Sequence, residues 1–518
     1  MLALLQAATP DRTPLWVVVG YMSLLVGLGF LVARRFRGTS SDYFVAGRSI
    51  GSFLLLMSVF GTTMTAFALV GSTGKSYEAG IGVYGLMASS SGLVHSLVFF
   101  LIGIRMWAIG KRYGYVTQIQ YFRERFQSNA LGWLLFPILV ALVIPYLLIG
   151  LLGAGSVMSA TTRGMFPETF ENGAVPPWLT GLVVSGVVLF YIFFGGVRGA
   201  AWANAFQTIV FMVMGVVAFV LISDRLGGLE QATARVMEHK PELLAREGEI
   251  GHLQFLTYFL VPLSVGMFPH LFQHWLTAKS AKTFRLSVVF HPIFIGIVWV
   301  PCILIGVWAH GAIGDELMRT PPRANAVLGV MVGALVKDPV ITGLLTAGIL
   351  AAIMSSLDSQ FVCLGTMFTH DIVTHTYGED RFTDEQKVLL GRGFIVVIVA
   401  ITYALTFFPP PSIFDLAVWC FSGFASLFPL VFASLYWRRV TRAGAIASVI
   451  AMAVTWFSLF WVGLVKRPAD AEGDFLVAGM MPVTVIFAVT AVVLVVVSLL
   501  TRPPSDEVVA RYLDRGEN

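Results

Sequence analysis

The chain has 518 residues, of which 57% are hydrophobic and only 12% are charged, with a formal net charge of +5. Soluble domains carry about 25% charged residues, so this composition excludes a soluble protein and predicts an all-α polytopic membrane protein. The basic residues fall in short loops between apolar runs, which argues against a nucleic-acid-binding surface.

Apolar runs long enough to cross a bilayer recur along the whole chain. A helical crossing needs roughly 20 apolar residues, and on this measure the sequence predicts about 13 transmembrane helices. We expect them near residues 14–33, 50–73, 82–109, 131–160, 177–195, 203–223, 253–277, 286–311, 340–373, 388–408, 413–437, 442–465 and 476–500. The first run is too long for the apolar part of a signal peptide and is expected to be retained.

Basic residues collect in the loops that follow odd-numbered helices. Because cytoplasmic loops are enriched in Lys and Arg, we expect a multi-pass protein of the plasma (inner) membrane with its N-terminus outside and its C-terminus in the cytoplasm. The loop 224–252 then lies outside, and residues 501–518 form a cytoplasmic tail. The residues concerned are Arg34, Arg35, Arg37 and Arg48 after the first helix, Arg105, Lys111, Arg112, Arg123 and Arg125 after the third, Lys279, Lys282 and Arg285 after the seventh, and Arg438, Arg439 and Arg442 after the eleventh.

Two of the predicted spans contain helix-breaking residues. In the second span, Gly61–Thr65 combines a glycine with three threonines, and in the seventh span Pro262, Gly266 and Pro269 fall close together. Proline removes a helical hydrogen bond and frees a carbonyl, which is tolerated at membrane depth only beside protein or a water-filled cavity. Two broken helices five spans apart are typical of two inverted five-helix repeats with an ion and a solute held at the breaks. The alternative is that Gly and Pro are simply common in membrane helices.

A polar stripe runs along the ninth predicted span. Ala352, Ser355, Ser356 and Ser359 are spaced to share one helix face, and Asp358 lies at its edge. Hydroxyl and carboxylate oxygens suit a hard cation such as Na⁺, and an ionisable group at membrane depth usually marks an ion or substrate path. The alternative is a seam that only hydrogen-bonds neighbouring helices.

Several ordered segments of the chain closely resemble the sodium:solute symporter family. The resemblance implies a leucine-transporter-like core with alternating access driven by Na⁺. Within a single domain, 1–518, it implies repeats over 50–223 and 253–437, with a peripheral helix at 14–33 and two more over 442–500. The matching segments are Ser40–Arg48, Phe194–Arg198 with Trp202 and Gln207, Pro269–His270, Ala351–Ser356, and Leu435–Arg439 with Ala443–Ala445.

The resemblance also implies a sodium site. Its ligands would be the backbone carbonyls of Gly61, Met64 and Ala352 and the hydroxyls of Ser355 and Ser356. This set agrees with the residue pattern, because it joins the interrupted second span to the polar stripe of the ninth.

One acidic residue departs from the family pattern. Many members carry an acid where this chain has Asn204, whereas here a carboxylate stands at Asp358, beside Ser359. We expect Asp358, Ser359 and Asn204 to form a second cation site or a protonation site. A hydrogen bond between Asp358 and Asn204 that serves only helix packing is the alternative.

Aromatic and threonine side chains near the breaks are candidates for contact with the solute. These are Thr63, Thr65, Phe67, Tyr146 and Phe268. Family members that carry proline tend to have aromatic residues shortly before the Pro-His pair, where this chain has Val261 and Val265, so the pattern disfavours proline. We expect a small carboxylate, an amino acid or a pantothenate-like compound.

The leading functional prediction is Na⁺-coupled symport of a small organic solute. A proton-driven or uncoupled carrier of the same fold and a membrane sensor module are the alternatives, and the short tail argues against the sensor. No nucleophile, metal or acid–base set converges, so we do not expect an enzyme or any cofactor besides Na⁺ as coupling ion. The expected partners are the solute, Na⁺ and the lipid bilayer, with neither nucleic acid nor an obligate protein partner.

Overall fold

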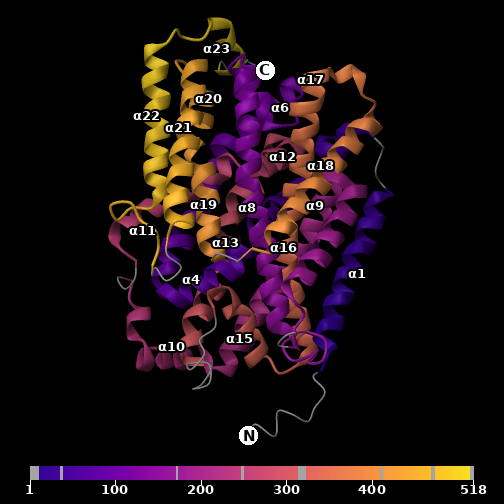
Figure 1. The fold of residues 1–518 in the computed structure, drawn as a ribbon, viewed down its shortest axis with the longest axis vertical. Helices are drawn as coiled ribbons and strands as arrows, with labels where there is room; N and C mark the ends of the chain where they lie inside the picture. The colour runs from indigo at the N-terminus through magenta and orange to yellow at the C-terminus, as the bar shows by residue number, and fades with distance from the viewer. Residues whose placement is uncertain are drawn as a thin grey trace.

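The computed structural model describes residues 11–34, 39–170, 173–246, 250–312, 323–408, 412–467 and 473–513. Over these residues the chain forms a bundle of helices without any β-strand, and most of the long helices run roughly along one direction (Figure 1). Ten helices are long and apolar enough to cross a membrane, and two bent helix pairs raise the number to 12. The predicted all-α membrane architecture is confirmed.

The membrane-crossing helices follow the predicted order. They are α1 (Thr13–Ala33), the segment Tyr84–Tyr113 with α5 (Ser89–Val98) and α6 (Ile104–Tyr113), α8 (Asn129–Thr161), α9 (Pro177–Arg225), α13 (Phe284–Ala312), α16 (Pro339–Met367), α18 (Asp384–Leu405), α19 (Ile413–Ser426) with α20 (Phe428–Tyr436), α21 (Arg442–Phe460) and α22 (Pro482–Leu500). The most enclosed are α16 and α19, since 83% of the apolar window of each span is buried. The polar stripe on α16 is therefore surrounded by protein.

Helix α9 contains two of the predicted spans. Its 49 residues would extend roughly 70 Å as a straight helix, more than twice the hydrocarbon thickness. The helix is interrupted at Gly196, whose φ of +53° lies in the region that favours glycine. A side chain there would collide with the backbone of Tyr43. The predicted helices 177–195 and 203–223 thus lie on either side of Gly196, while the exact number of 13 crossings stays a prediction.

Both predicted helix breaks are present. Helix α3 (Ser52–Thr63) and the segment Phe67–Ala79, which includes η3 (Phe67–Gly71) and α4 (Ser72–Ala79), are bent by 58°. The hydroxyl of Thr65 accepts from the backbone N–H of Phe67 at 3.0 Å, which caps the second half of this span. In the other pair, the segment His252–Gly266 and α12 (Pro269–Thr277) are bent by 50°. Pro269 begins α12, where a missing N–H costs no helical bond.

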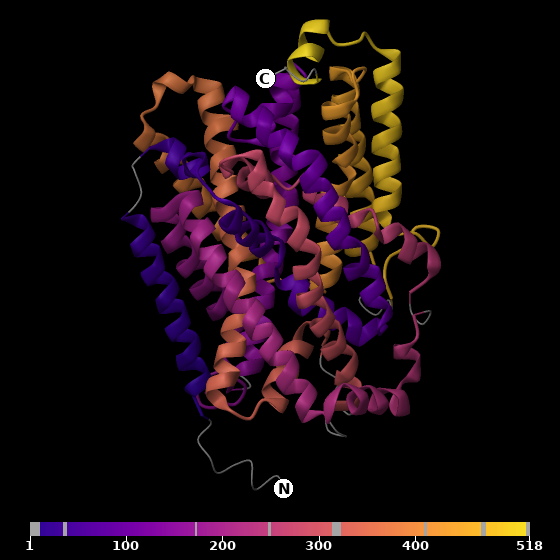
Figure 2. The ribbon, with the colours of Figure 1, turned by 180° about the vertical axis from the view of Figure 1, so that it is seen from behind.

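Three segments predicted as loops or tail contain further helices. The loop 224–252 holds α10 (Gly228–His239), α15 (Val327–Leu335) precedes α16, and α23 (Asp506–Leu513) follows α22. Helices α10 and α15 lie at the lower end of the molecule, whereas α17 (His375–Tyr377) and α23 lie at the upper end (Figures 1 and 2). Two of the basic residues used for orientation, Arg35 and Arg37, and the tail beyond 513 lie outside the described residues.

Candidate cation and solute site

The first helix break and the polar stripe of α16 meet at Ser355. Its hydroxyl lies 2.7 Å from the carbonyl oxygen of Gly61 and 2.8 Å from that of Ala352. All three residues are buried. Gly61 allows this approach because a side chain here would overlap the hydroxyl of Thr208 on α9 and crowd the backbone of Asn204. The structure therefore brings three of the predicted sodium ligands together.

The other two predicted ligands lie on the same two segments. Met64 ends α3 in an extended conformation, with φ −90° and ψ 97°, so the helix direction changes at this residue. The hydroxyl of Ser356 donates to the carbonyl of Ile353 at 2.8 Å within α16. The contacts among the described residues do not join Met64 or Ser356 directly to Ser355, and their role as ligands stays a prediction.

Asp358, Ser359 and Asn204 lie together in a buried polar cluster, and their role as a second cation site or a protonation site stays a prediction. The hydroxyl of Ser359 lies 3.0 Å from a carboxylate oxygen of Asp358 and 2.8 Å from the amide of Asn204. With the amide turned to match donors with acceptors, Asn204 donates to both oxygens of Asp358 at 3.0 Å. No Lys or Arg of the described residues forms an ion pair with Asp358, which is fully buried.

Three further residues of this cluster were not predicted. The hydroxyl of Tyr191 on α9 donates to Asp358 at 3.1 Å. On α12, Nε2 of His274 lies 2.9 Å from the hydroxyl of Ser359, and its Nδ1 lies 2.8 Å from the hydroxyl of Ser58 on α3. The cluster thus connects α16 and α9 to α3 and α12, which are one half of each broken span. No local sequence motif marks these residues, because each contact joins helices far apart in the chain.

A small cavity lies beside the two breaks. Its volume is about 30 Å³, which is room for about two water molecules. Four of the five predicted solute contacts line it, and Thr65 does not. The lining residues are Thr63, Met64, Phe67, Ser91, His95, Tyr146, Tyr258, Val261, Pro262, Ser264, Val265, Phe268, Trp299 and Phe421. No Lys, Arg, Asp or Glu of the described residues is among them.

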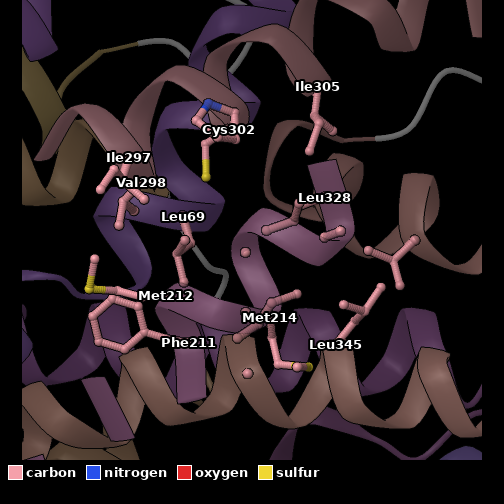
Figure 3. A pocket seen from close by; sticks show the side chains of 16 residues that line it. Leu69, Phe211, Met212, Met214, Ile297, Val298, Cys302, Ile305, Leu328 and Leu345 are labelled. Carbon is pink, nitrogen blue, oxygen red and sulfur yellow. The ribbon is translucent and has the colours of Figure 1, made fainter. Parts of the chain in front are cut away.

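A second cavity of about 30 Å³ is a less suitable binding site. Side chains from η3, α9, α13, α15 and α16 surround it, among them Leu69, Phe211, Cys302 and Leu345 (Figure 3). Its lining is apolar apart from the thiol of Cys302 and backbone atoms. Because solute sites need a few converging polar groups, we assign this space to packing between helices.

Comparisons with known proteins identify the family and the fold of the chain. The model of the sodium:solute symporter family matches residues 43–451. A sodium/proline symporter of Staphylococcus aureus (strain JH9) is 25% identical, over 94% of this chain and 93% of the relative. The structure of a Na⁺-coupled sialic acid symporter matches with a TM-score of 0.74 at 16% identity, over 96% of this chain and 99% of the other.

The fold match extends to a nucleobase-cation-symport-1 family transporter with a TM-score of 0.53 at 14% identity, over 91% of this chain and 97% of the other. The leucine-transporter-like fold is thus confirmed, and the family and its relatives are transporters and not enzymes. Together with the family match over residues 43–451, the two broken spans and the oxygen-rich stripe of α16 lead to one conclusion: the chain belongs to the sodium:solute symporter family.

Proposed function

We propose that this protein binds Na⁺ where the break after α3 meets α16 and uses it to drive uptake of a small organic solute. The ligands are the carbonyls of Gly61, Met64 and Ala352 and the hydroxyls of Ser355 and Ser356. The observation that carries the proposal is the contact of Ser355 with the carbonyls of Gly61 and Ala352, at 2.7 and 2.8 Å. Neutral oxygens bind Na⁺ only moderately, which allows its release in each cycle.

The proposed sodium site and the solute cavity share one residue, which couples Na⁺ binding to solute binding. Met64 belongs to the proposed sodium site and also lines the cavity beside it. A bound Na⁺ offsets the charge of an anionic solute held nearby, and by thermodynamic linkage the solute then strengthens Na⁺ binding equally. A membrane potential of 100 mV supplies about 2.3 kcal/mol per net charge moved, so each Na⁺ beyond those that balance the charge of the solute supports about fiftyfold accumulation.

The lining of the cavity supports a small, largely apolar solute, and the cavity must widen from its present volume of about 30 Å³ to admit one. Its walls are formed by Phe67, Tyr146, Phe268, Trp299 and Phe421. A carboxylate can be held by the N-terminal ends of the broken helices without an arginine. We therefore propose a small carboxylate, an amino acid or a pantothenate-like compound.

Proline belongs to this substrate class, and the observations for and against it differ. The curated relatives are sodium/proline symporters. In this chain Val261 and Val265 line the cavity where aromatic residues are expected in proline carriers. Proline is therefore one candidate to be measured beside the others.

The Asp358 cluster supports a second coupling ion. A fully buried carboxylate without a cationic side chain beside it is costly unless it takes up a cation or a proton. We propose that Asp358, Ser359 and Asn204 bind a second Na⁺ or a proton, which would make a proton-driven carrier the alternative function. The variant Asp358→Asn is expected to change the Na⁺ stoichiometry or the pH dependence of uptake, and if both remain as in the wild type, the cluster serves only packing.

Transport in proteoliposomes tests the function. Labelled pyruvate, L-proline and pantothenate are offered with an inward Na⁺ gradient or an inward proton gradient, each imposed alone. Uptake that requires the Na⁺ gradient supports the proposal. Uptake driven by the proton gradient alone supports a proton-driven carrier. Uptake that depends on neither gradient contradicts both Na⁺ coupling and proton coupling.

A further inference from the structure

Two buried histidines pair behind the wall of the solute cavity. His95 on α5 lines the cavity, and its Nδ1 lies 3.0 Å from Nε2 of His291 on α13. His291 is fully buried, with the rings of Phe60 and Phe99 edge-on at 5.3 and 5.0 Å. The imidazole of His95 is thus held in place from behind by a second imidazole.

The pair shares one hydrogen between the facing nitrogens, so two arrangements exist. If His95 donates, His291 carries its own hydrogen on Nδ1, and if His291 donates, its Nδ1 is a bare acceptor. Nδ1 of His291 is sealed from solvent and has no partner among the described residues. In buried backbone an N–H without a partner is rarer than a C=O without one, and we apply the same preference to the imidazole. His291 therefore donates through Nε2.

This arrangement determines which ring nitrogen of His95 is a hydrogen-bond donor toward the cavity. Because its Nδ1 accepts from His291, its hydrogen lies on Nε2. Nε2 of His95 has no hydrogen-bond partner among the described residues, and unlike Nδ1 of His291 it is not sealed from solvent. The hydroxyls of Tyr146 and Tyr258, which also line the cavity, are likewise without a partner in the described part of the chain and are not sealed.

We propose that His95 donates from Nε2 to a carboxylate of the solute and that His291 is the positioning residue that keeps this nitrogen a donor. The inference rests on the proposed function, since it names the chemical class taken by that same cavity. A carboxylate offers only acceptors and can accept from His95 and from both tyrosines. A primary amide of the same shape would turn an NH₂ group toward donors, leaving polar groups unpaired.

The first test compares acids with amides. In proteoliposomes with an inward Na⁺ gradient, uptake of labelled pyruvate, L-proline and pantothenate is measured in the presence of either the unlabelled acid or the corresponding primary amide as competitor. The acids are expected to compete at least about tenfold better than their amides, as befits the loss of a charge-assisted hydrogen bond. Equal competition by acid and amide would overturn the inference.

The second test removes the two imidazoles. His95→Phe is expected to raise the KM for the best-transported acid about tenfold or more, with little change in kcat. His95→Gln, whose amide still donates, should give a KM between those of the wild type and His95→Phe. His291→Phe should lower the ratio of acid to amide preference, because His95 is then free to carry its hydrogen on either nitrogen. A purely structural role would change stability without changing this ratio.

Controls separate this inference from the function on which it rests. Ser96→Ala on the same helix removes a buried hydroxyl without a partner among the described residues, and it should leave KM unchanged. Tryptophan fluorescence on addition of Na⁺ alone reports the sodium site in every variant. If Na⁺ alone gives no signal and no acid is taken up with it, the proposed function fails. If Na⁺ binds and drives uptake but His95→Phe keeps the wild-type KM, the carboxylate inference alone is wrong. If Na⁺ binds and none of the acids is carried, the carboxylate inference and the proposed substrate class both fail, while the sodium site stands.

Discussion

Ser355 is the residue on which the proposed sodium site depends most directly. Its hydroxyl contacts carbonyls of both the broken span and α16. Ser355→Ala removes one ligand and leaves the buried carbonyl of Gly61 without this donor, so the Na⁺ concentration for half-maximal uptake should rise about tenfold. Ser448→Ala is the matched control, because the hydroxyl of Ser448 on the peripheral helix α21 makes the same kind of bond, to Ala445 at 2.9 Å. An unchanged Na⁺ dependence in Ser355→Ala would contradict the site.

Gly61 is needed for a close approach between α3 and α9. A methyl group here would overlap the hydroxyl of Thr208. Gly61→Ala should therefore displace the carbonyl that faces Ser355 and reduce Na⁺-driven uptake, since overpacking costs typically 1–3 kcal/mol. The double variant Gly61→Ala with Thr208→Ala should recover part of the uptake, although it loses the bond from Thr208 to Met57. Failure of the second substitution to help would show that the collision is not the cause.

The contact between Ser355 and Gly61 could be anticipated from the sequence, whereas its surroundings could not. A glycine-containing break and a serine stripe at helical spacing are local patterns, and the family resemblance joins them. Tyr191 and His274 approach Asp358 and Ser359 across 167 and 85 residues of chain, so their partners depend on how α9, α12 and α16 pack. Tyrosine and histidine on apolar helix faces are common, and nothing local distinguishes these two.

At the scale of elements, the turn within α9 is held by an ion pair. Arg198, just after the interruption at Gly196, contacts Asp42 on the short helix α2 (Ser40–Val45) at 2.6 Å. The side chain of Asp42 is only 3% exposed, so Arg198→Met removes a short charge-assisted contact from a buried carboxylate. The substitution should lower stability by about 2 kcal/mol, measured as a lower melting temperature in detergent. Arg511→Met, which breaks an exposed pair with Glu124 at 3.8 Å, is the control and should have little effect.

Elements of high hydropathy were predicted well, and short polar helices were not. The breaks in the second and seventh spans were predicted because Gly and Pro act on the backbone locally. The helix α10 lies in a segment of mixed charge that carries no long apolar run, so the search for crossings passed over it. The interruption at Gly196 falls between two predicted spans, but its close approach to the backbone of Tyr43 could not be predicted, because Tyr43 belongs to another element.

At the scale of the whole molecule, the two ends of the bundle must face opposite compartments. Helix α10 lies at the lower end and α17 at the upper end (Figure 1). The basic residues after the odd-numbered helices predict that the end with α17 faces the cytoplasm. Under this orientation α3 and α12 point inward from the breaks, and the cluster around His274 lies on the inner side of the proposed sodium site.

Cysteine labelling in intact cells tests this orientation. The three native cysteines, Cys302, Cys363 and Cys420, are buried, so background labelling should be low. Glu238→Cys on α10 and Asp380→Cys after α17 place a single thiol at exposed positions on opposite ends.

A membrane-impermeant maleimide should label the first variant in intact cells and the second only after permeabilisation. The reverse result would show the opposite orientation in the membrane. Na⁺ would then enter from the end that carries α17, and the His274 cluster would be the outer side of the cation path.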